Sequence, residues 1–305
     1  MLAPMQGLTN HALRSLFIER VHPDVVFTEF VRARACSKKI ISNNDCLEAA
    51  SRHAGAPLVV QLIGADTEAM VKAACTVLDL GAEHININLG CPYTRMTGSR
   101  AGGNLLPQPA ELRRLLSRLR QCINGGFSVK ARAGFDDPSQ LFSLLHLFED
   151  CGVDFLIVHP RTVQEGYRGR ANHEITAEVV RQTTLPVIAN GDVFTAADGR
   201  EVLDLTGAAG LMLGRGAIAD PFLFERIRGR YPAVSEPEKR AAELRGYLQD
   251  LLERYREIFC GEQQILGKMK EVLAQIHEPD LAKPVKQLRK CKKMSHFTEM
   301  LAAFP

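Results

Sequence analysis

The stretch His84–Leu106, HININLGCPYTRMTGSRAGGNLL, indicates how this chain folds. Its first residues alternate between polar and apolar, with isoleucine or leucine at every second position, which is the pattern of a β-strand. The alternation stops at Gly90-Cys91-Pro92, and a glycine-rich segment follows. Cys91 therefore lies where a strand ends and a loop begins, a position that suits a thiol that must meet a substrate. The alternative is that Cys91 only packs, as most cysteines do.

The same alternation of a short apolar run and a helical pattern recurs on both sides of this stretch. We predict strands at 2–5, 24–30, 58–63, 84–89, 128–133, 155–159, 186–189 and 210–213. We predict helices from Thr9, a possible N-cap, to 20, and at 67–80, 109–122, 139–150, 175–181, 196–205 and 221–228. This count of strands and helices predicts an α/β fold of the (β/α)8 TIM barrel type. A doubly wound open sheet, which needs no closure, is the rival.

The strand pattern stops near Ala233. Charged helical patterns follow at 236–259, 263–276 and 284–301, with no further strand signal. Tyr231-Pro232 interrupts the chain just before them. We therefore predict a barrel domain at 1–232 and a C-terminal all-helical domain at 233–305.

Composition narrows the class of protein. The chain has 305 residues and 46% hydrophobic content, enough for a large packed core, and no apolar run long enough to cross a bilayer. We therefore expect no membrane association and a cytoplasmic protein. Its eight cysteines form no C-x-x-C pair, so we expect reduced thiols and no metal. The net charge is +3, but Leu281–His296 holds six of the 38 basic residues and no acidic one. The oligomeric state stays open, with a monomer as the default expectation.

In a barrel, binding and catalytic residues gather at the carboxyl ends of the strands. Those positions are polar in this sequence. They are Pro4, Met5 and Gln6 after the first strand, Gln61 in the third, Asn88 and Cys91 at the end of the fourth, Lys130 and Arg132 in the fifth, His159 and Arg161 at the end of the sixth, Asn190, Gly191 and Asp192 after the seventh, and Gly214 and Arg215 after the eighth.

Glycines after the seventh and eighth strands would let backbone N–H groups approach an anion, and Arg215 would add a charge-assisted contact. A tight turn alone would also need glycine. Lys130 lies inside an apolar strand and is expected to point along the barrel axis towards a negative group, unless it forms a structural ion pair. His159 could likewise be a hydrogen-bonded core residue. Reduced FMN, with an anionic ring and a phosphate, would explain Lys130, His159 and Arg215 together.

Five motifs then point to one family. They are Asn88-x-Gly90-Cys91-Pro92 followed by Gly98 and Leu105-Leu106, Val129-Lys130-Ala131-Arg132, Val158-His159-x-Arg161-Thr162, Ala189-Asn190-Gly191-Asp192 and Gly214-Arg215-Gly216. Taken together, they resemble those of the dihydrouridine synthases, flavoenzymes that reduce uridine in tRNA. The resemblance runs from Leu2 through the barrel into the helical domain.

The resemblance implies FMN as the cofactor, NADPH or NADH as the reductant, and Cys91 as the group that protonates C5 of uracil after hydride reaches C6. Pro4, Met5, Gln6 and Gln61 would hold the flavin ring, and Lys130 and His159 would face its pyrimidine edge. Asn190, Gly191, Asp192, Gly214 and Arg215 would bind the phosphate. One position departs from the family pattern, because Pro160 stands where glycine is common and so offers no backbone N–H.

The segments Thr28–Arg32 and Gln164–Arg168 resemble the bacterial subgroup that acts at uridine 16 of the D-loop, although the residues after Tyr167 differ. The expected contacts with tRNA are Asn88, Arg32, Arg34, Arg132, Tyr167, Lys268, Lys270, Lys286 and Lys290. Three alternatives stay open: the same chemistry at uridine 20 or 20a, a free-pyrimidine flavoenzyme of the dihydroorotate dehydrogenase type, and an RNA-binding protein without catalysis.

Overall fold

The barrel is closed. The computed structural model describes residues 1–35, 37–53, 55–92 and 101–305, and its parallel strands follow the order β1-β3-β4-β5-β6-β7-β8, with β2 also paired to β3. Leu2 bridges the two ends, because it pairs with Val26 of β1 and with Leu213 just after β8. The closure excludes a doubly wound open sheet and confirms the predicted (β/α)8 barrel.

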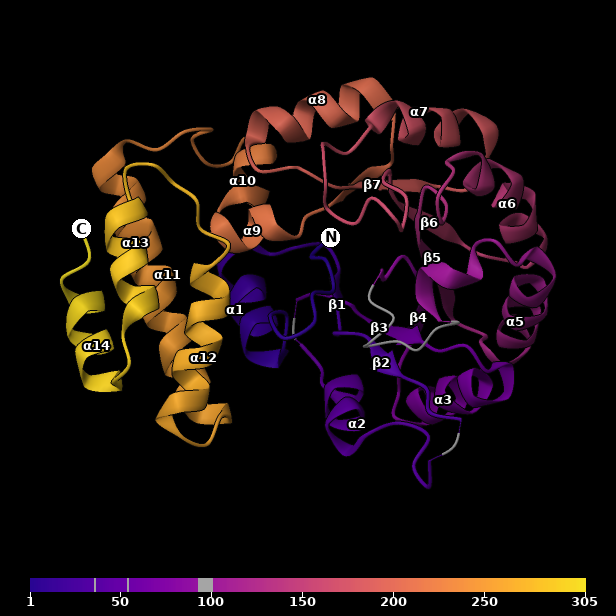
Figure 1. Ribbon diagram of the computed structural model, residues 1–305, viewed down its shortest axis with the longest axis horizontal. Helices are drawn as coiled ribbons and strands as arrows, with labels where there is room; N and C mark the ends of the chain where they lie inside the picture. Colours follow the sequence, from indigo (N-terminus) through magenta and orange to yellow (C-terminus); the bar gives the residue numbers. More distant parts are fainter. Residues whose placement is uncertain (36, 54, 93–100) are drawn as a thin grey trace.

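Each strand of the barrel is followed by a helix, except that β1 leads directly into β2 (Figure 1). The strands are β1 (Val26–Phe27), β2 (Val31–Arg32), β3 (Leu58–Ile63), β4 (His84–Leu89), β5 (Gly126–Arg132), β6 (Phe155–His159), β7 (Val187–Asn190) and β8 (Gly210–Met212). The surrounding helices are α1 (His11–Val21), α2 (Asn43–Ala50), α3 (Thr67–Asp79), α5 (Pro109–Cys122), α6 (Ser139–Asp150), α7 (His173–Gln182), α8 (Ala196–Thr206), α9 (Arg215–Ala219) and α10 (Leu223–Ile227).

The strand predicted at 24–30 is wrong in extent, because it is split into β1 and β2. Phe27 pairs with Val59 and Val31 pairs with Leu62, so the segment from β1 to β2 carries one residue more than the facing part of β3. The Thr28 hydroxyl accepts a hydrogen bond from the backbone N–H of Gln61 at 3.1 Å, in place of a backbone carbonyl. The result is a β-bulge, which redirects the side chains between the two strands.

Two helix boundaries also differ from the prediction. The N-cap of α1 is Asn10, whose side chain accepts from Leu13 N–H, whereas the Thr9 hydroxyl accepts from Met5 N–H at 2.8 Å. The helix predicted at 284–301 is broken into α13 (Ala282–Lys290) and α14 (Met294–Ala302). The break lets α13 pack on α12 (Glu262–Leu273) while α14 packs on α11 (Pro237–Ile258).

The barrel interior has an apolar part and a polar part. Its apolar residues are Ala3, Phe27, Val59, Ile157, Ile188 and Met212. On the side of β3 to β5, the Asn86 amide accepts from Gln61 Nε2 and donates to Ser128 Oγ, both at 2.8 Å. All three of these polar side chains are fully buried. The interior is therefore filled by side chains, as is usual for this fold, and ligand chemistry is confined to the open end.

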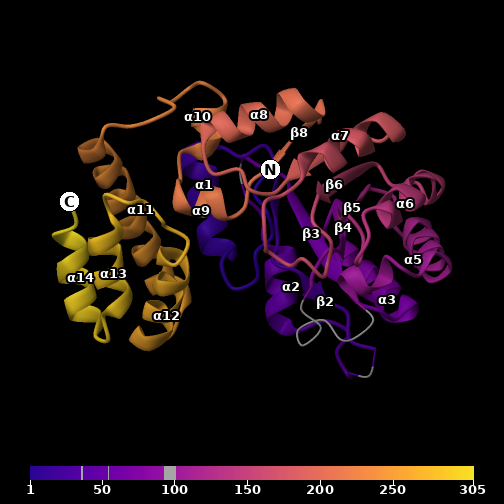
Figure 2. The ribbon, with the colours of Figure 1, turned by 45° about the horizontal axis from the view of Figure 1, so that its top comes forward.

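Helices α11 to α14 form a block beside α1, α9 and α10, away from the β4–β6 side of the barrel (Figures 1 and 2). The contact is apolar, since the Phe17 ring of α1 packs edge-on against Tyr247 of α11 at 6.1 Å and against Phe224 of α10 at 6.4 Å. A shared core thus joins the barrel to the helical block. Within the described ranges, no helix is long and apolar enough to cross a membrane.

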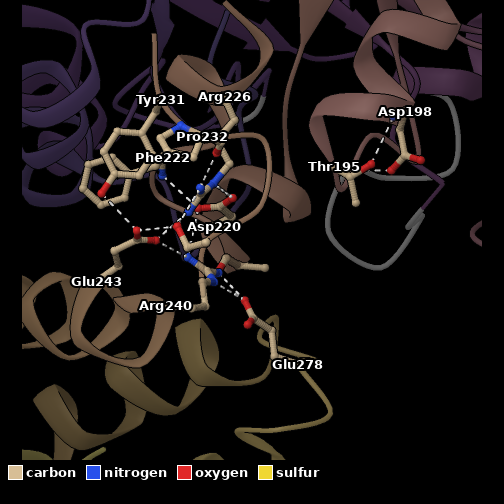
Figure 3. Close-up of polar contacts among 12 residues, drawn as sticks. Thr195, Asp198, Asp220, Phe222, Arg226, Tyr231, Pro232, Arg240, Glu243 and Glu278 are labelled. Atoms are coloured by element: carbon tan, nitrogen blue, oxygen red, sulfur yellow. Dashed lines mark hydrogen bonds and ion pairs between the residues drawn. The ribbon is translucent and has the colours of Figure 1, made fainter. Parts of the chain in front are cut away.

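Paired charges are buried at the same junction (Figure 3). Arg226 of α10 contacts Asp220 at 2.7 Å and Glu243 of α11 at 2.5 Å, and its side chain is 3% exposed. Arg240 of α11 contacts Asp220 at 3.0 Å and also pairs with Glu278. Because a buried charge without a partner is costly, this network favours a single arrangement of α11 against the end of the barrel.

Candidate active site

A pocket opens at the carboxyl ends of β5 to β8. Nine of the eleven residues predicted to hold a cofactor line it: Pro4, Met5, Lys130, His159, Asn190, Gly191, Asp192, Gly214 and Arg215. The two others lie elsewhere, since the Gln6 side chain is exposed and Gln61 is buried beneath the rim. The pocket uses the loops after β7 and β8 and the start of a short helix, which is the usual phosphate position of this fold.

Lys130 provides an ammonium group at the pocket. Its neighbours on β5, Val129 and Ala131, are fully buried on the outer face, so Lys130 is turned inwards. Burial, with a smaller contribution from the Arg132 charge, lowers the pKa of Lys130 to about 7, although the charge on Cys91 opposes this shift. An anion in the pocket would raise that pKa again, because it favours the protonated form.

His159 is held as a neutral hydrogen-bonding group. Burial, followed by the positive charges of Lys130, Arg132, Arg161 and Arg215, lowers the pKa of His159 far below its ordinary value. Its Nε2 lies 3.2 Å from Nη1 of Arg161, which can only donate. The hydrogen-bond network therefore assigns the imidazole proton to Nδ1, where it can be donated to a ligand.

Asp192 organises two arginines. Its carboxylate contacts both Nη atoms of Arg161, lies 3.0 Å from Nη2 of Arg215, and accepts from Ala171 N–H at 2.8 Å. Burial would raise the pKa of Asp192, but these hydrogen bonds and charges outweigh burial and hold it below its ordinary range. Asp192 thus orients Arg215, which is the more exposed of the two arginines.

Aromatic rings hold the Arg215 guanidinium in place. The Tyr167 ring centre lies 4.8 Å from it and the Phe194 ring centre 5.5 Å. Both rings line the pocket, and Tyr167 also approaches the His159 ring at 6.2 Å. Tyr167, predicted as a contact with tRNA, therefore belongs to the pocket wall in this structure.

Close packing at the pocket wall explains two glycines. Gly191 has a φ of +128°, and a Cβ there would lie 2.9 Å from the His159 ring. A Cβ on Gly216, at the start of α9, would lie 2.1 Å from the Val193 carbonyl oxygen. Only glycine lets the loops after β7 and β8 approach each other and the pocket this closely.

Asn88 links Cys91 to the barrel interior. Its side-chain oxygen accepts from Gly90 N–H at 3.0 Å and from Cys91 N–H at 2.9 Å, while its Nδ2 donates to Gln61 Oε1 at 2.8 Å. Cys91 is half-buried and is close enough to Lys130 for their charges to interact. The turn after β4 therefore holds the Cys91 backbone next to the cationic side of the pocket.

Arg132 is buried and joins two loops, the one after β4 and the one after β6. Its Nε donates to Gly90 O at 2.9 Å, and its Nη1 donates to Thr162 O at 2.8 Å and to Gly166 O at 2.5 Å. Its guanidinium also lies 5.2 Å from the Tyr167 ring centre. In this structure Arg132 supports the loop that carries Cys91, and its contact with a substrate stays a prediction.

The other predicted contacts with tRNA lie away from the pocket. Arg32 and Arg34 are exposed at the end of β2, and Lys286 and Lys290 are exposed on α13. Lys268 and Lys270 are half-buried on α12. The Pro160 carbonyl accepts from Asn172 N–H at 3.4 Å, and Gly98 lies outside the described residues. Among the residues described, no cluster of His, Cys, Asp and Glu is arranged to hold a metal.

The sequence reasoning assigned no role to Arg161 or Phe194. The signal for Arg161 was its place two residues after His159, at the end of a barrel strand. The signal for Phe194 was an aromatic residue two positions after Asp192, in the loop predicted to bind phosphate. Both roles depend on partners from other strands, which a single segment does not reveal.

Comparisons with known proteins identify the family of this chain. The family model described as "Dihydrouridine synthase (Dus)" matches residues 1–303. The tRNA-dihydrouridine(16) synthase of Haemophilus influenzae is 37% identical over 230 residues, which cover 73% of this chain and 74% of that protein. The protein of the same name from Aquipseudomonas alcaligenes is 30% identical over 315 residues, covering 100% of this chain and 99% of that protein.

Solved structures agree on the fold. Histamine dehydrogenase from Rhizobium sp. 4-9 matches with a TM-score of 0.60 and 14% identity, over 83% of this chain and 48% of that one. At this level of identity the likeness shows the barrel fold alone. The match to the family model over nearly the whole chain, together with these relatives, shows that the chain belongs to the dihydrouridine synthase family.

Proposed function

We propose that this protein reduces the C5=C6 bond of uridine 16 in the D-loop of tRNA, with FMN in the pocket and NADPH or NADH as the source of hydride. Position 16 is supported by the names of the curated relatives. The observation that carries the chemistry is the pocket itself, which gathers Lys130, His159 and Arg215 beside the turn that carries Cys91.

The pocket residues fit FMN. Arg215 and the glycine loops after β7 and β8 offer a cation and close backbone approach, as a phosphate requires. A Cβ at Gly214 would lie 3.4 Å from the Met5 sulfur, so glycine leaves this part of the wall open. Pro4, Met5 and Gln6 would hold the ring, and Asn190, Gly191, Asp192, Gly214 and Arg215 the phosphate end. Bound FMN would supply the hydride that reaches C6 of uracil.

Lys130 and His159 would face the part of the ring that gains negative charge. A protonated Lys130 stabilises that charge directly. His159, which stays neutral because its pKa is lowered, can donate a hydrogen bond to the ring without carrying a positive charge. Gln61 is also proposed for the ring. Its amide contacts Asn86 and Asn88 beneath the pocket, so any effect on the ring would pass through the Asn88 turn.

Cys91 would protonate C5 from the face opposite the hydride. A general acid must hold its proton until hydride arrives and then release it to the carbon, and a thiol can do both. Asn88 and Arg132 hold the turn around Cys91 through Gly90 and Cys91 backbone groups. This support keeps the thiol next to the place where the base must lie.

The basic face of α13 would grip the tRNA backbone. Lys283, Lys286 and Lys290 are exposed, while Val285 and Leu288 are buried against the helical block. A base inside folded tRNA must turn outwards to reach the pocket, and contacts with flanking phosphates stabilise that state. The other proposed contacts with tRNA are Asn88, Arg32, Arg34, Arg132, Tyr167, Lys268 and Lys270, with residues 233–305 as the tRNA-binding domain. We propose that the protein acts as a monomer in the cytoplasm.

The test uses purified protein, FMN, NADPH and two tRNA transcripts, one natural and one with cytidine at position 16. We expect dihydrouridine at position 16 of the first transcript and none in the second. Dihydrouridine at another D-loop position would refute the assignment to position 16. Reduction of free pyrimidines without RNA would instead favour the dihydroorotate dehydrogenase type, for which the basic α13 face has no use.

A further inference from the structure

The backbone of Gly7 is held at both its N–H and its C=O by residues outside the pocket. Its N–H donates to the Glu29 carboxylate at 2.9 Å, and its carbonyl accepts from Lys268 Nζ at 2.7 Å. Gly7 has a φ of +85°, and a Cβ there would lie 3.3 Å from Glu271 of α12. The helical block therefore touches the barrel within one residue of Gln6.

Gly7 belongs to a compact turn that begins at Met5. Thr9 N–H donates to Met5 O at 3.0 Å, and Met5 N–H donates to the Thr9 hydroxyl at 2.8 Å. These bonds make the turn stiff, so its orientation depends on what holds Gly7. Met5 lines the pocket, and its position is therefore linked to the Gly7 peptide.

Glu29 reaches Gly7 because of the β-bulge. The extra residue between the β1 and β2 pairings lies in the segment 28–30, at the carboxyl end of β1. Bulges often redirect a side chain beside an active site. Here the bulge brings a carboxylate to the turn that carries Met5 and Gln6.

Lys268 comes from the helical block. It extends from α12, and besides the Gly7 carbonyl it contacts Glu271 at 2.9 Å. Its side chain is 22% exposed, against 50% for Glu271. Glu29 and Lys268, from different parts of the fold, thus hold the two successive peptide groups on either side of the Gly7 Cα.

We propose that Glu29 and Lys268 are positioning residues of the flavin reaction: together they fix the two peptide groups at Gly7, and through them the turn that presents Met5 to the flavin ring. The proposal rests on the proposed function, since it needs FMN in the pocket. It gives the helical block a second task besides binding RNA, because removing Lys268 from Gly7 would loosen the cofactor site.

The surroundings of Glu29 supply a signature for the test. The charged and titratable groups that face it are Glu48 of α2, Arg14 of α1, Lys268 of α12 and Tyr255 of α11. Arg14 is committed to Glu48, with a contact of 2.6 Å. Burial, reinforced by the Glu48 charge, raises the pKa of Glu29 to about 7, while the Gly7 hydrogen bond, Lys268 and Arg14 oppose the rise. The strength of the Glu29–Gly7 bond should therefore change near neutral pH.

The experiment compares FMN binding and the visible spectrum of bound FMN in wild-type protein and in Glu29→Gln, Glu29→Ala and Lys268→Met. Lys72→Met is the control, since Lys72 is exposed on α3, outside both the Gly7 turn and the helical block. We expect Glu29→Ala and Lys268→Met each to weaken FMN binding about tenfold. Glu29→Gln, which keeps the acceptor oxygen, should restore affinity but lose a spectral change centred near pH 7.

Unchanged affinity and spectrum in both Glu29→Ala and Lys268→Met would overturn the proposal. Loss of the pH-dependent change in Lys72→Met would do the same. If Glu29→Ala fails to fold, Glu29→Gln and Lys268→Met still decide the outcome. A wild-type protein that takes up no FMN, or takes it up and forms no dihydrouridine, would instead refute the proposed function, so the two failures are distinct.

Discussion

Arg161 and Arg215 share the Asp192 carboxylate but should respond differently to removal. We expect Arg161→Met to destabilise the fold and Arg215→Met mainly to weaken FMN binding. The Arg161 side chain is 2% exposed, whereas the Arg215 side chain is 37% exposed and faces the pocket. Comparing the two variants therefore distinguishes a residue that supports the fold of the site from one that contacts the ligand.

The magnitudes follow from burial and partners. Besides Asp192, Arg161 donates to His159 Nε2, Arg168 O and Gly169 O, and its loss leaves these acceptors without a donor. Breaking such a buried pair costs about 3 kcal/mol. For a chain of 305 residues this is a fall in Tm of roughly 5 °C. The exposed Arg215 pair is screened by solvent and contributes about 1 kcal/mol or less.

Thermal unfolding and FMN titration measure the two effects. A charge-assisted hydrogen bond to phosphate contributes about 1.5–3 kcal/mol, so Arg215→Met should weaken FMN binding about 10- to 100-fold with little change in Tm. The reasoning fails if Arg215→Met lowers Tm as much as Arg161→Met while FMN affinity stays unchanged. Arg168→Met, in the same loop but exposed, is the matched control.

Three further results are expected. FMN affinity should fall between pH 7 and 9, because Lys130 has a pKa of about 7 before an anion binds and loses its proton over this range. Lys130→Met should make FMN affinity nearly independent of pH. The same dependence of FMN affinity on pH in both proteins would exclude a role of the Lys130 charge in FMN binding. Gly191→Ala should lower both Tm and FMN affinity, because a residue with a side chain at a φ of +128° costs about 1–3 kcal/mol and the new Cβ would lie 2.9 Å from the His159 ring. Gly229→Ala, also at positive φ but with open space around it, should keep FMN affinity. Similar FMN affinities for the two variants would argue against close packing at Gly191. Lys286→Glu combined with Lys290→Glu should weaken tRNA binding and reduce its salt dependence by about two units of slope, and an unchanged slope would remove α13 from the interface.

Much of the barrel could be predicted because apolar runs mark its buried strands. The bounds expected for the strands at 58–63, 84–89 and 155–159 match β3, β4 and β6. The bulge between β1 and β2 could not be predicted, since it depends on the Thr28 hydroxyl meeting Gln61 of another strand. The break between α13 and α14 was also hidden, because the helical pattern continues across it and only packing on α11 and α12 decides its place.

The site follows the same division. A closed barrel brings all strand ends to one rim, so nine of the eleven cofactor residues named strand by strand from the sequence line one pocket. What the sequence could not give is how their side chains pair. Asp192 accepts hydrogen bonds from two arginines, and the Gln61 amide hydrogen-bonds two asparagines. Glu29 accepts from the Gly7 N–H in the region of the bulge between β1 and β2.

The most direct test of the account is a single-turnover assay of Cys91→Ala with prereduced FMN and the natural tRNA transcript. We expect the variant to bind FMN and accept hydride from NADPH normally, while dihydrouridine formation slows by at least about 100-fold, since a general acid contributes that much or more. Formation of dihydrouridine within about twofold of the wild-type rate would contradict the proposed role of Cys91 and with it the central claim about this site.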